Sequence, residues 1–324
     1  MGSKLDEAFA KINKMYDDGT IGTLGAMPHQ DIEMIPSGSL ALDMALGGGY
    51  PKGRVVELFG EESSGKTTLA IHAMAEVQKV GGTAGIIDME HAFDKEYAVN
   101  LGVDVDALVF SQPDTCEQAW EILELTVETG ELDLLVVDSI AAMTPKRELE
   151  GEMGDAVIGL QAKLMGQGFR KNIARIKNKG CTVIFINQLR DNVGVTYGSK
   201  KITTGGKSTK FYASQRIQVR RVEMVKQGEE VIAHKTEAKI VKNKVAPPHK
   251  TAIFNISFGT GINKTLEILD GAVEFDVVIK SGSWFSYKGE KLGQGLINVV
   301  KLLNDNPELL EEIEISFLEK LNAI

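Results

Sequence analysis

Residues 55–68 read VVELFGEESSGKTT, in which a short apolar run is followed by a glycine-rich turn and the start of a helical stretch. The part from Gly60 to Thr67 matches the pattern G-x-x-x-x-G-K-[ST] at every position. In this pattern the glycines allow the backbone to curl until its N–H groups face a phosphate, and the helix that follows contributes its dipole. A strand before the turn and a helix after it are the context that the motif requires, so the stretch predicts a nucleotide-phosphate site in an α/β fold.

Two side chains of this loop have chemistry suited to a nucleoside triphosphate. Lys66 supplies a point charge for the β and γ phosphates, and the hydroxyl of Thr67 can bind Mg²⁺. The residues expected to surround the phosphates are Gly60, Glu61, Glu62, Ser63, Ser64, Gly65, Lys66, Thr67 and Thr68. The alternative is a glycine-rich surface loop, which the flanking strand and helix disfavour.

Apolar runs of strand length alternate with helical stretches around and after the loop. Strands are expected at residues 55–59, 85–88, 108–110, 134–138 and 182–187, and helices at 67–80, 115–128 and 160–177. The second of these helices begins with a capping box, Thr115 with Gln118. Strands that are apolar throughout and separated by helices predict an α/β fold with a mostly parallel central sheet covered on both faces.

The two ends of the chain have different patterns. Residues 3–16 place apolar side chains on one helical stripe, which a glycine-rich stretch separates from the rest. After residue 210, half-exposed strands are expected at 215–222, 236–245 and 252–258, and a helix at 307–321. We therefore expect an N-terminal helix set apart from the core of the chain, and a smaller region that begins at about residue 264.

Composition narrows the class of protein. The 324 residues are 43% hydrophobic and 25% charged, which is ordinary for a soluble globular protein. No apolar run has the roughly 18 residues that a membrane span needs, and the N-terminus lacks the layout of a secretory signal. Two cysteines, Cys116 and Cys181, are too few for a disulfide framework, so a reducing cytoplasm fits best. Because the net charge is −9, any site for nucleic acid must be local.

Carboxylates end two of the expected strands. Residues 134–138 form an apolar run that ends at Asp138, which predicts a Mg²⁺ ligand in partnership with the phosphate loop, although alone it could be a turn residue. Residues 85–88 lead to Asp88 and Glu90 at the same edge of the sheet, where ligands of such folds bind. Either carboxylate could be the general base for hydrolysis, and spacing alone leaves the two nearly tied.

A basic segment follows the strand expected at 182–187. Residues 189–210 contain five lysines or arginines, one aspartate and four glycines, with no sustained period. This composition predicts a mobile loop that begins beside the nucleotide site, where ATP could order it to grip nucleic-acid phosphates. A solvated surface loop is the alternative that the segment itself leaves open.

Longer motifs in this chain resemble the RecA family of bacterial and phage recombinases, and the resemblance covers nearly the whole chain. They are GEESSGKTT (60–68), IIDMEHAFD (86–94), SQPDTCEQA (111–119), VVDSIAAMTPKRELEGEMGD (136–155), FINQ (185–188), TTGGKSTKFYAS (203–214), KIVKNKVAPPHK (239–250) and WFSYKGEKLGQG (284–295). The resemblance implies a short N-terminal helical arm at 1–30, a RecA-type P-loop ATPase core at 31–263 and a small α/β C-terminal domain at 264–324. It implies a role in DNA repair and the SOS response. It also implies ATP-dependent filaments on single-stranded DNA that pair with a homologous duplex and exchange strands.

The resemblance assigns roles around the nucleotide. It implies that Glu90 rather than Asp88 activates the attacking water, and that Asp94 and Tyr97 contact the adenine, Tyr97 by stacking. Gln188 matches the residue that senses the γ-phosphate. Further matches imply contacts between subunits, which are made by Phe211, by Lys242 and Lys244 toward the neighbour's nucleotide, and by the arm at 1–30.

The resemblance also implies two DNA-binding loops, at about 150–159 and 189–206. Matches to phosphate contacts are Lys163, Arg170, Arg190, Gly205, Gly206 and Lys207, and matches to apolar side chains that wedge between bases are Ile158 and Val193. None of these contacts reads a base edge, so binding is expected to be nearly independent of sequence. Asn192 and Lys207 depart from the family pattern, and the sequence ends at Ile324 without a long acidic tail, which puts regulation by such a tail in doubt.

Two other classes share parts of this pattern. A hexameric helicase would use the same core, but rings do not need a docking arm and usually carry a separate partner domain. A non-catalytic scaffold regulated by ATP would not need the full set of Lys66, Thr67, Asp138 and Glu90.

Overall fold

The computed structural model describes residues 3–16, 19–26, 32–152, 159–191, 201–227 and 229–322. The chain divides into a short unit, Met1–Glu33, and a large one, Met34–Ile324. The short unit contains helix α1 (Lys4–Tyr16) and a 3-10 turn, Leu24–Ala26. No residue of α1 is buried, and its apolar side chains therefore remain available for contact.

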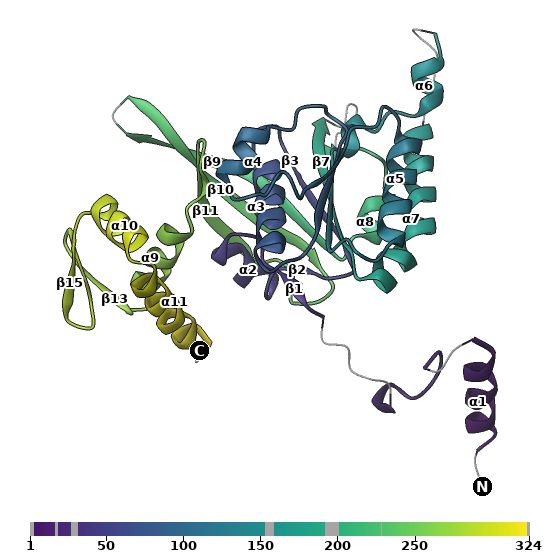
Figure 1. Cartoon of the computed structure of the whole chain (residues 1–324), viewed down its shortest axis with the longest axis horizontal. Coiled ribbons are helices and arrows are strands. Elements are labelled where there is room, and N and C mark those ends of the chain that lie inside the picture. The colour runs from purple at the N-terminus through teal and green to yellow at the C-terminus, as the bar shows by residue number, and fades with distance from the viewer. Residues whose placement is uncertain are drawn as a thin grey trace. The chain divides into compact units, whose positions relative to one another are not determined.

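The large unit is built on a sheet that contains ten strands within the described residues, in the order β12-β11-β10-β9-β3-β7-β6-β4-β5, with β8 paired to β7 (Figure 1). Strands β9, β3, β7, β6, β4 and β5 are parallel, and β9 to β12 pair antiparallel. The bounds are β3 (Val55–Gly60), β4 (Ala84–Asp88), β5 (Val109–Ser111), β6 (Leu134–Asp138), β7 (Thr182–Asp191), β8 (Lys201–Thr203), β9 (Gln215–Gln227), β10 (Glu230–Asn243), β11 (Thr251–Ser257) and β12 (Gly261–Ile262). The predicted α/β fold with a mostly parallel sheet is confirmed.

Helices cover both faces of this sheet, and the strand residues alternate between two cores. Leu134 and Val136 of β6 belong to one apolar cluster, whereas Leu135 and Val137 belong to the other. The helices are α2 (Leu40–Leu46), α3 (Lys66–Lys79), α4 (Lys95–Asn100), α5 (Cys116–Glu128), α6 (Lys146–Glu150), α7 (Leu160–Lys179) and α8 (Ser208–Tyr212). A two-stranded sheet of β1 (Met34–Ile35) and β2 (Tyr50–Pro51) and a 3-10 turn, Ile140–Ala142, complete this part. Burial on both faces explains why β6 is apolar from end to end until Asp138.

Most local predictions hold, and one is wrong. Thr115 caps α5 in the predicted capping box with Gln118. The stretch from 189 was predicted to be loop, but β7 continues to Asp191 and pairs antiparallel with β8, with Arg190 opposite Ile202. The paired segments are short and largely polar, so neither shows the apolar alternation that would predict a strand.

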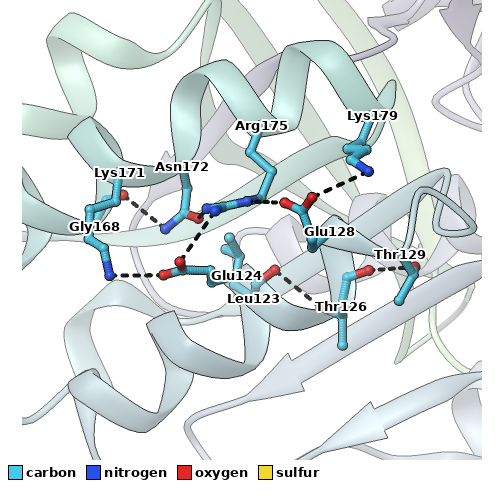
Figure 2. A network of polar contacts seen from close by, with 10 residues as sticks. All are labelled: Leu123, Glu124, Thr126, Glu128, Thr129, Gly168, Lys171, Asn172, Arg175 and Lys179. Atoms are coloured by element: carbon cyan, nitrogen blue, oxygen red, sulfur yellow. Dashed lines mark hydrogen bonds and ion pairs between the residues drawn. The ribbon is translucent and has the colours of Figure 1, made fainter.

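Ion pairs join α5 to α7 on the outside of the sheet (Figure 2). Arg175 lies between two glutamates of α5, with Nη2 3.3 Å from Glu124 and Nε bonded to Glu128. Lys171 and Lys179 extend the row at 3.0 Å and 3.4 Å from the same two carboxylates. Because α7 begins at Leu160, directly after the first expected DNA loop, this row fixes the helix that carries Lys163 and Arg170.

The C-terminal region has its own apolar core. It comprises α9 (Lys264–Glu274), β13 (Val278–Ser281), β14 (Trp284–Tyr287), β15 (Glu290–Gln294), α10 (Leu296–Asp305) and α11 (Pro307–Asn322). Its carboxylate Glu267 accepts hydrogen bonds from Ser39 Oγ (2.7 Å) and from the backbone N–H of Leu40 (2.9 Å), at the start of α2. None of the helices within the described ranges combines the length and the apolar character that crossing a lipid bilayer requires.

Candidate nucleotide site

The P-loop turns between β3 and α3 where only glycine fits. Gly65 has φ 96°, and a Cβ there would lie 2.4 Å from Cδ1 of Ile256. At Gly60 a Cβ would lie 2.1 Å from the backbone oxygen of Val219. Both distances are far below van der Waals contact, so any side chain would displace the loop from β9 and β11. The loop is therefore packed against the sheet with the N-terminus of α3 open to an anion.

Lys66 is a buried cation, with 7% of its surface exposed. Its Nζ donates to the backbone oxygen of Glu61 at 2.6 Å. Burial lowers the pKa of Lys66, while the nearby carboxylates of Asp138 and Glu90 oppose that shift. A buried ammonium is strongly stabilised by a nearby anion, and a phosphate bound at the N-terminus of α3 would be such an anion.

The side chains of Thr67 and Asp138 are in contact at the edge of the sheet. The Thr67 hydroxyl donates to Oδ2 of Asp138 at 2.8 Å, which joins the first turn of α3 to the end of β6. Burial raises the pKa of Asp138 to about 6, and the charges of Glu90 and Asp88 add to this effect. Two hard oxygen donors at the mouth of a phosphate loop fit Mg²⁺, which keeps several waters and substrate oxygens in its shell.

The two carboxylates that spacing could not separate have different surroundings. Asp88 is buried, and its oxygens accept from the N–H of Glu90 (3.1 Å), the N–H of Phe93 (3.0 Å) and Nε2 of Gln112 (3.0 Å). These bonds shape the turn after β4. Hydrogen bonds thus occupy both oxygens of the buried Asp88, whereas the side chain of Glu90 is exposed.

Glu90 is held at one oxygen. Its Oε1 accepts from the hydroxyl of Ser139 and from Nε2 of Gln188, the latter at 2.9 Å. Ser139 follows Asp138 and is fully buried, and Gln188 lies near the end of β7. The structure therefore brings Glu90, Gln188 and the Asp138–Thr67 pair to one edge of the sheet, which is the edge the sequence predicted.

A cavity of about 300 Å³ adjoins the P-loop. Its lining consists of Ser63, Ser64, Gly65, Lys66, Thr67, Thr68, Tyr97, Arg221, His234, Ile256, Ser257, Phe258 and Gly259. The Tyr97 hydroxyl lies 3.0 Å from Oγ1 of Thr68, and Asp94 caps α4 by accepting from the N–H of Tyr97 at 2.9 Å. The sequence did not predict the wall that β9, β10 and β11 supply, because these residues carry no motif and lie more than 150 positions from the P-loop.

The expected subunit-contact residues lie around α8. Phe211 is 71% exposed, which is unusual for a phenylalanine. The Nζ of Lys242 donates to the backbone oxygens of Lys210 (2.7 Å) and Phe211 (3.1 Å), and burial lowers its pKa to about 8. Lys244 is exposed just beyond the end of β10. Lys242 and Phe211 are therefore directly linked in the single chain.

The expected DNA-contact residues divide into two groups. Ile158 and Val193, with most of the two loops, lie outside the described residues. The exposed cations among the rest are Lys163, Arg170, Arg190 and Lys207. Gly205 and Gly206 lie at the C-terminal end of the second loop. A Cβ on Gly206 would lie 2.7 Å from Cβ of Ala162 on α7. The return of the second loop thus packs on the helix that follows the first loop.

A P-loop at the edge of one mostly parallel sheet, with an acidic strand end beside it, defines a protein of the P-loop ATPase class. Comparison with known families is more specific. Residues 3–263 match the RecA N-terminal domain, and residues 266–322 match the RecA C-terminal domain. The chain belongs to the RecA family, whose members are ATP-binding, DNA-dependent ATPases that act as recombinases in DNA repair.

Individual relatives are similar over almost the whole length of this chain. Protein RecA of Frankia alni is 53% identical over 321 residues, which are 99% of this chain and 93% of the relative. Protein RecA of Paenarthrobacter aurescens is 54% identical over 320 residues, 98% of this chain and 92% of the relative. Protein RecA of Bifidobacterium longum is 53% identical and matches 96% of this chain and 78% of the relative. The resemblance found in the motifs is therefore confirmed across the full chain.

Proposed function

We propose that this chain binds ATP and Mg²⁺ at the P-loop, forms a helical filament on single-stranded DNA and exchanges strands with a homologous duplex. The observation that carries the proposal is the Thr67–Asp138 contact at 2.8 Å, beside a buried Lys66. An exposed hydroxyl bonded to a buried carboxylate, next to a buried ammonium, is suited to a magnesium–triphosphate. Membership of the RecA family supplies the DNA part of the proposal.

In this proposal the P-loop residues from Gly60 to Thr68 hold the phosphates, and Lys66 neutralises the β and γ groups. Thr67 and Asp138 are the Mg²⁺ ligands, directly or through water. Lys66 must then exchange the backbone oxygen of Glu61 for phosphate oxygen, which is a stronger partner because it is charged. Asp94 and Tyr97 contact the adenine.

Glu90 is proposed as the general base that accepts a proton from the attacking water. Asp88 is unsuited, because three N–H groups already occupy its oxygens. Glu90 is bonded at Oε1, and among the described residues no hydrogen bond to its Oε2 is found. Oε2 is thus the oxygen that can face water, while Ser139 and Gln188 fix the carboxylate.

Gln188 is proposed as the link between nucleotide and DNA. Its amide bonds Glu90, and its Oε1 lies 3.4 Å from Nη2 of Arg190 on the same strand. Arg190 is the first cation of the second DNA loop. A change at the γ-phosphate that moves Gln188 would therefore move the start of that loop.

DNA is proposed to bind through the exposed cations and the two loop segments. Phosphate contacts are assigned to Lys163, Arg170, Arg190, Gly205, Gly206 and Lys207, and base wedges to Ile158 and Val193. The domain roles that we propose are an arm at 1–30 that docks on a neighbouring subunit, an ATPase core at 31–263 and a small domain at 264–324.

Lys242 and Lys244 are proposed to complete the neighbour's nucleotide site, with Phe211 at the contact. A cation supplied in trans stabilises the charge that develops in the transition state and makes hydrolysis depend on assembly. In the single chain Lys242 is bonded to the backbone of α8, so it must leave Lys210 and Phe211 to reach a neighbour.

Electron microscopy tests the assembly. With single-stranded DNA and a slowly hydrolysed ATP analogue, we expect open helical filaments. Closed rings would favour a hexameric helicase, and dispersed subunits would contradict the filament. Lys66→Ala is the matched control, because it should remove ATP-dependent binding to DNA without changing the surface that meets DNA.

Mixed filaments test catalysis in trans. Subunits with Lys66→Ala and subunits with both Lys242→Ala and Lys244→Ala should each be inactive alone. Where an intact Lys66 meets a neighbour with both lysines, a complete site forms, so the mixture should regain part of the DNA-stimulated hydrolysis. If the mixture stays inactive although mixed filaments form, the lysines do not act in trans.

A further inference from the structure

The cavity beside the P-loop contains a buried histidine whose ring nitrogens make no hydrogen bond within the described part of the chain. His234 of β10 is 6% exposed, and neither Nδ1 nor Nε2 has a hydrogen-bond partner among the described residues. The other well-buried histidine, His72, differs, because its Nε2 accepts from the N–H of Ile262 at 2.9 Å. His72 is thus explained by the fold, and His234 is not. A buried polar group without a partner costs free energy, so a further partner is expected for His234.

The position of His234 points to a ligand of the same cavity. Its Nε2 lies 3.7 Å from where a Cβ on Gly65, the residue that precedes α3, would stand. Ser64 lines the cavity too, and its buried hydroxyl also has no partner within the described chain. Two orphaned polar side chains, one from the P-loop and one from β10, therefore share one cavity of about 300 Å³.

The chemistry of His234 selects the part of the nucleotide that it can contact. Burial and the charge of Arg221 lower the pKa of His234, so the ring is neutral near neutral pH. A neutral imidazole offers one N–H donor and one lone pair. Phosphate oxygens only accept, and Lys66 with the P-loop N–H groups already serves them. Ribose hydroxyls and base edges both donate and accept, and the rings of Tyr97 and Phe258 line the same cavity.

We propose that His234 hydrogen-bonds to the nucleoside part of the bound nucleotide, at a ribose hydroxyl or a base edge, and so helps to determine nucleotide specificity. The inference rests on the proposed binding of ATP at the P-loop. It adds a residue of β10, far from the nucleotide motifs in sequence, to the specificity of that site.

Nucleotide titrations without DNA test the proposal. His234→Phe keeps an aromatic ring of similar size but removes both hydrogen-bonding nitrogens. It should weaken ATP binding roughly three- to tenfold, the size of one lost hydrogen bond. Inorganic tripolyphosphate, which has no nucleoside, should bind the variant and the wild type equally. His234→Gln, which retains a donor and an acceptor, should recover part of the affinity, and the exposed His249→Ala should change nothing.

Analogues identify the contacted group. If the ribose is the partner, 2′-deoxy-ATP or 3′-deoxy-ATP should bind the wild type and His234→Phe with similar affinity. If the base is the partner, 7-deaza-ATP or purine riboside triphosphate should do so.

The contrary outcomes are distinct. Equal ATP affinity for wild type and a folded His234→Phe, or equal losses of ATP and tripolyphosphate, would overturn the role of His234 but not ATP binding at the P-loop. If the wild type binds neither ATP nor tripolyphosphate, the proposed function and this inference both fail. Thermal unfolding of each variant shows whether it is folded.

Discussion

Strand β7 presents two consecutive amides to two glutamates with different tasks. Asn187 faces Glu57 of β3, with Nδ2 2.9 Å from Oε1, and Glu57 is fully buried in an ion pair with Arg216. Gln188 points to the opposite face and reaches Glu90, whose other partner is the hydroxyl of Ser139. One carboxylate is neutralised by a cation, and the other is held by neutral donors only.

The difference separates structure from chemistry. A guanidinium neutralises a carboxylate and fixes its orientation, so such an ion pair is suited to the middle of a buried sheet. Neutral donors orient a carboxylate without cancelling its charge, which suits a general base. The hydrogen-bond and ion-pair partners of a carboxylate therefore indicate whether it is structural or catalytic better than its position in a strand does.

Removal of the cation from the structural pair should have the largest effect. Arg216→Ala leaves Glu57 charged and buried, and should cost about 3–5 kcal/mol in the free energy of unfolding. Denaturant titration measures the loss. The control is Arg220→Ala on the same strand, since Arg220 is 60% exposed beside Glu237 and its loss should cost about 1 kcal/mol or less. Equal losses at the two positions would contradict the distinction.

Removal of charge from Glu90, the proposed general base, should spare the fold. Glu90→Gln should bind ATP normally, slow its hydrolysis roughly 10²-fold or more, and persist on DNA. Single-turnover hydrolysis and nucleotide affinity measure the two effects separately. If hydrolysis stays normal, or if ATP binding is lost, Asp88 becomes the better candidate for the base.

A third carboxylate extends the comparison, because Glu267 is partly buried, accepts hydrogen bonds from neutral donors and does not line the cavity at the P-loop. Burial raises its pKa from an ordinary 4.5 to about 7, against the hydrogen bonds from Ser39 and Leu40. The folded state thus binds the proton more tightly than the unfolded state. The stabilisation is complete below pH 4.5 and is lost as pH rises through 7.

Glu267→Gln should remove this pH dependence. The variant should gain stability relative to the wild type as pH rises from about 5 to about 8, by on the order of 1–3 kcal/mol. Unfolding midpoints in guanidinium at the two pH values test this, with the exposed Glu274→Gln of the same helix as control. An advantage of the variant that is constant with pH would show that Glu267 does not titrate in this range.

Local patterns predicted much of the architecture. β6 from Leu134 to Asp138 and the capping box at Thr115 were predicted at the right residues, because burial on both faces and helix capping leave short-range signals. The pairing of β7 with β8 and the contribution of β10 to the cavity were not predicted. They depend on antiparallel partners that carry no motif of their own.

The sequence predicted which side chains gather at the P-loop edge of the sheet, such as Thr67 and Asp138, but not the contacts that they make. The tie between Asp88 and Glu90 could not be resolved from spacing, because spacing does not show that backbone N–H groups occupy Asp88. The resemblance to the family favoured Glu90, and the geometry gives a physical reason for that choice. Glu57, Arg216 and His234 were missed, since a single polar residue within a strand gives no signal of its distant partner.

The smallest effect is expected at the row of ion pairs between α5 and α7, where the cations lie at the surface (Figure 2). Arg175→Met keeps the aliphatic stem but removes the contacts to Glu124 and Glu128. The side chain of Glu128 is 54% exposed, so water replaces much of what the arginine supplied. The loss should stay below about 1 kcal/mol and should shrink in 1 M salt, which screens such pairs over roughly 3 Å. Hydrolysis of ATP should be unchanged, because none of the three residues touches the nucleotide cavity or Glu90. A salt-independent loss as large as that of Arg216→Ala would mean that the row acts as a buried network, and that exposure does not separate the two kinds of ion pair in this fold.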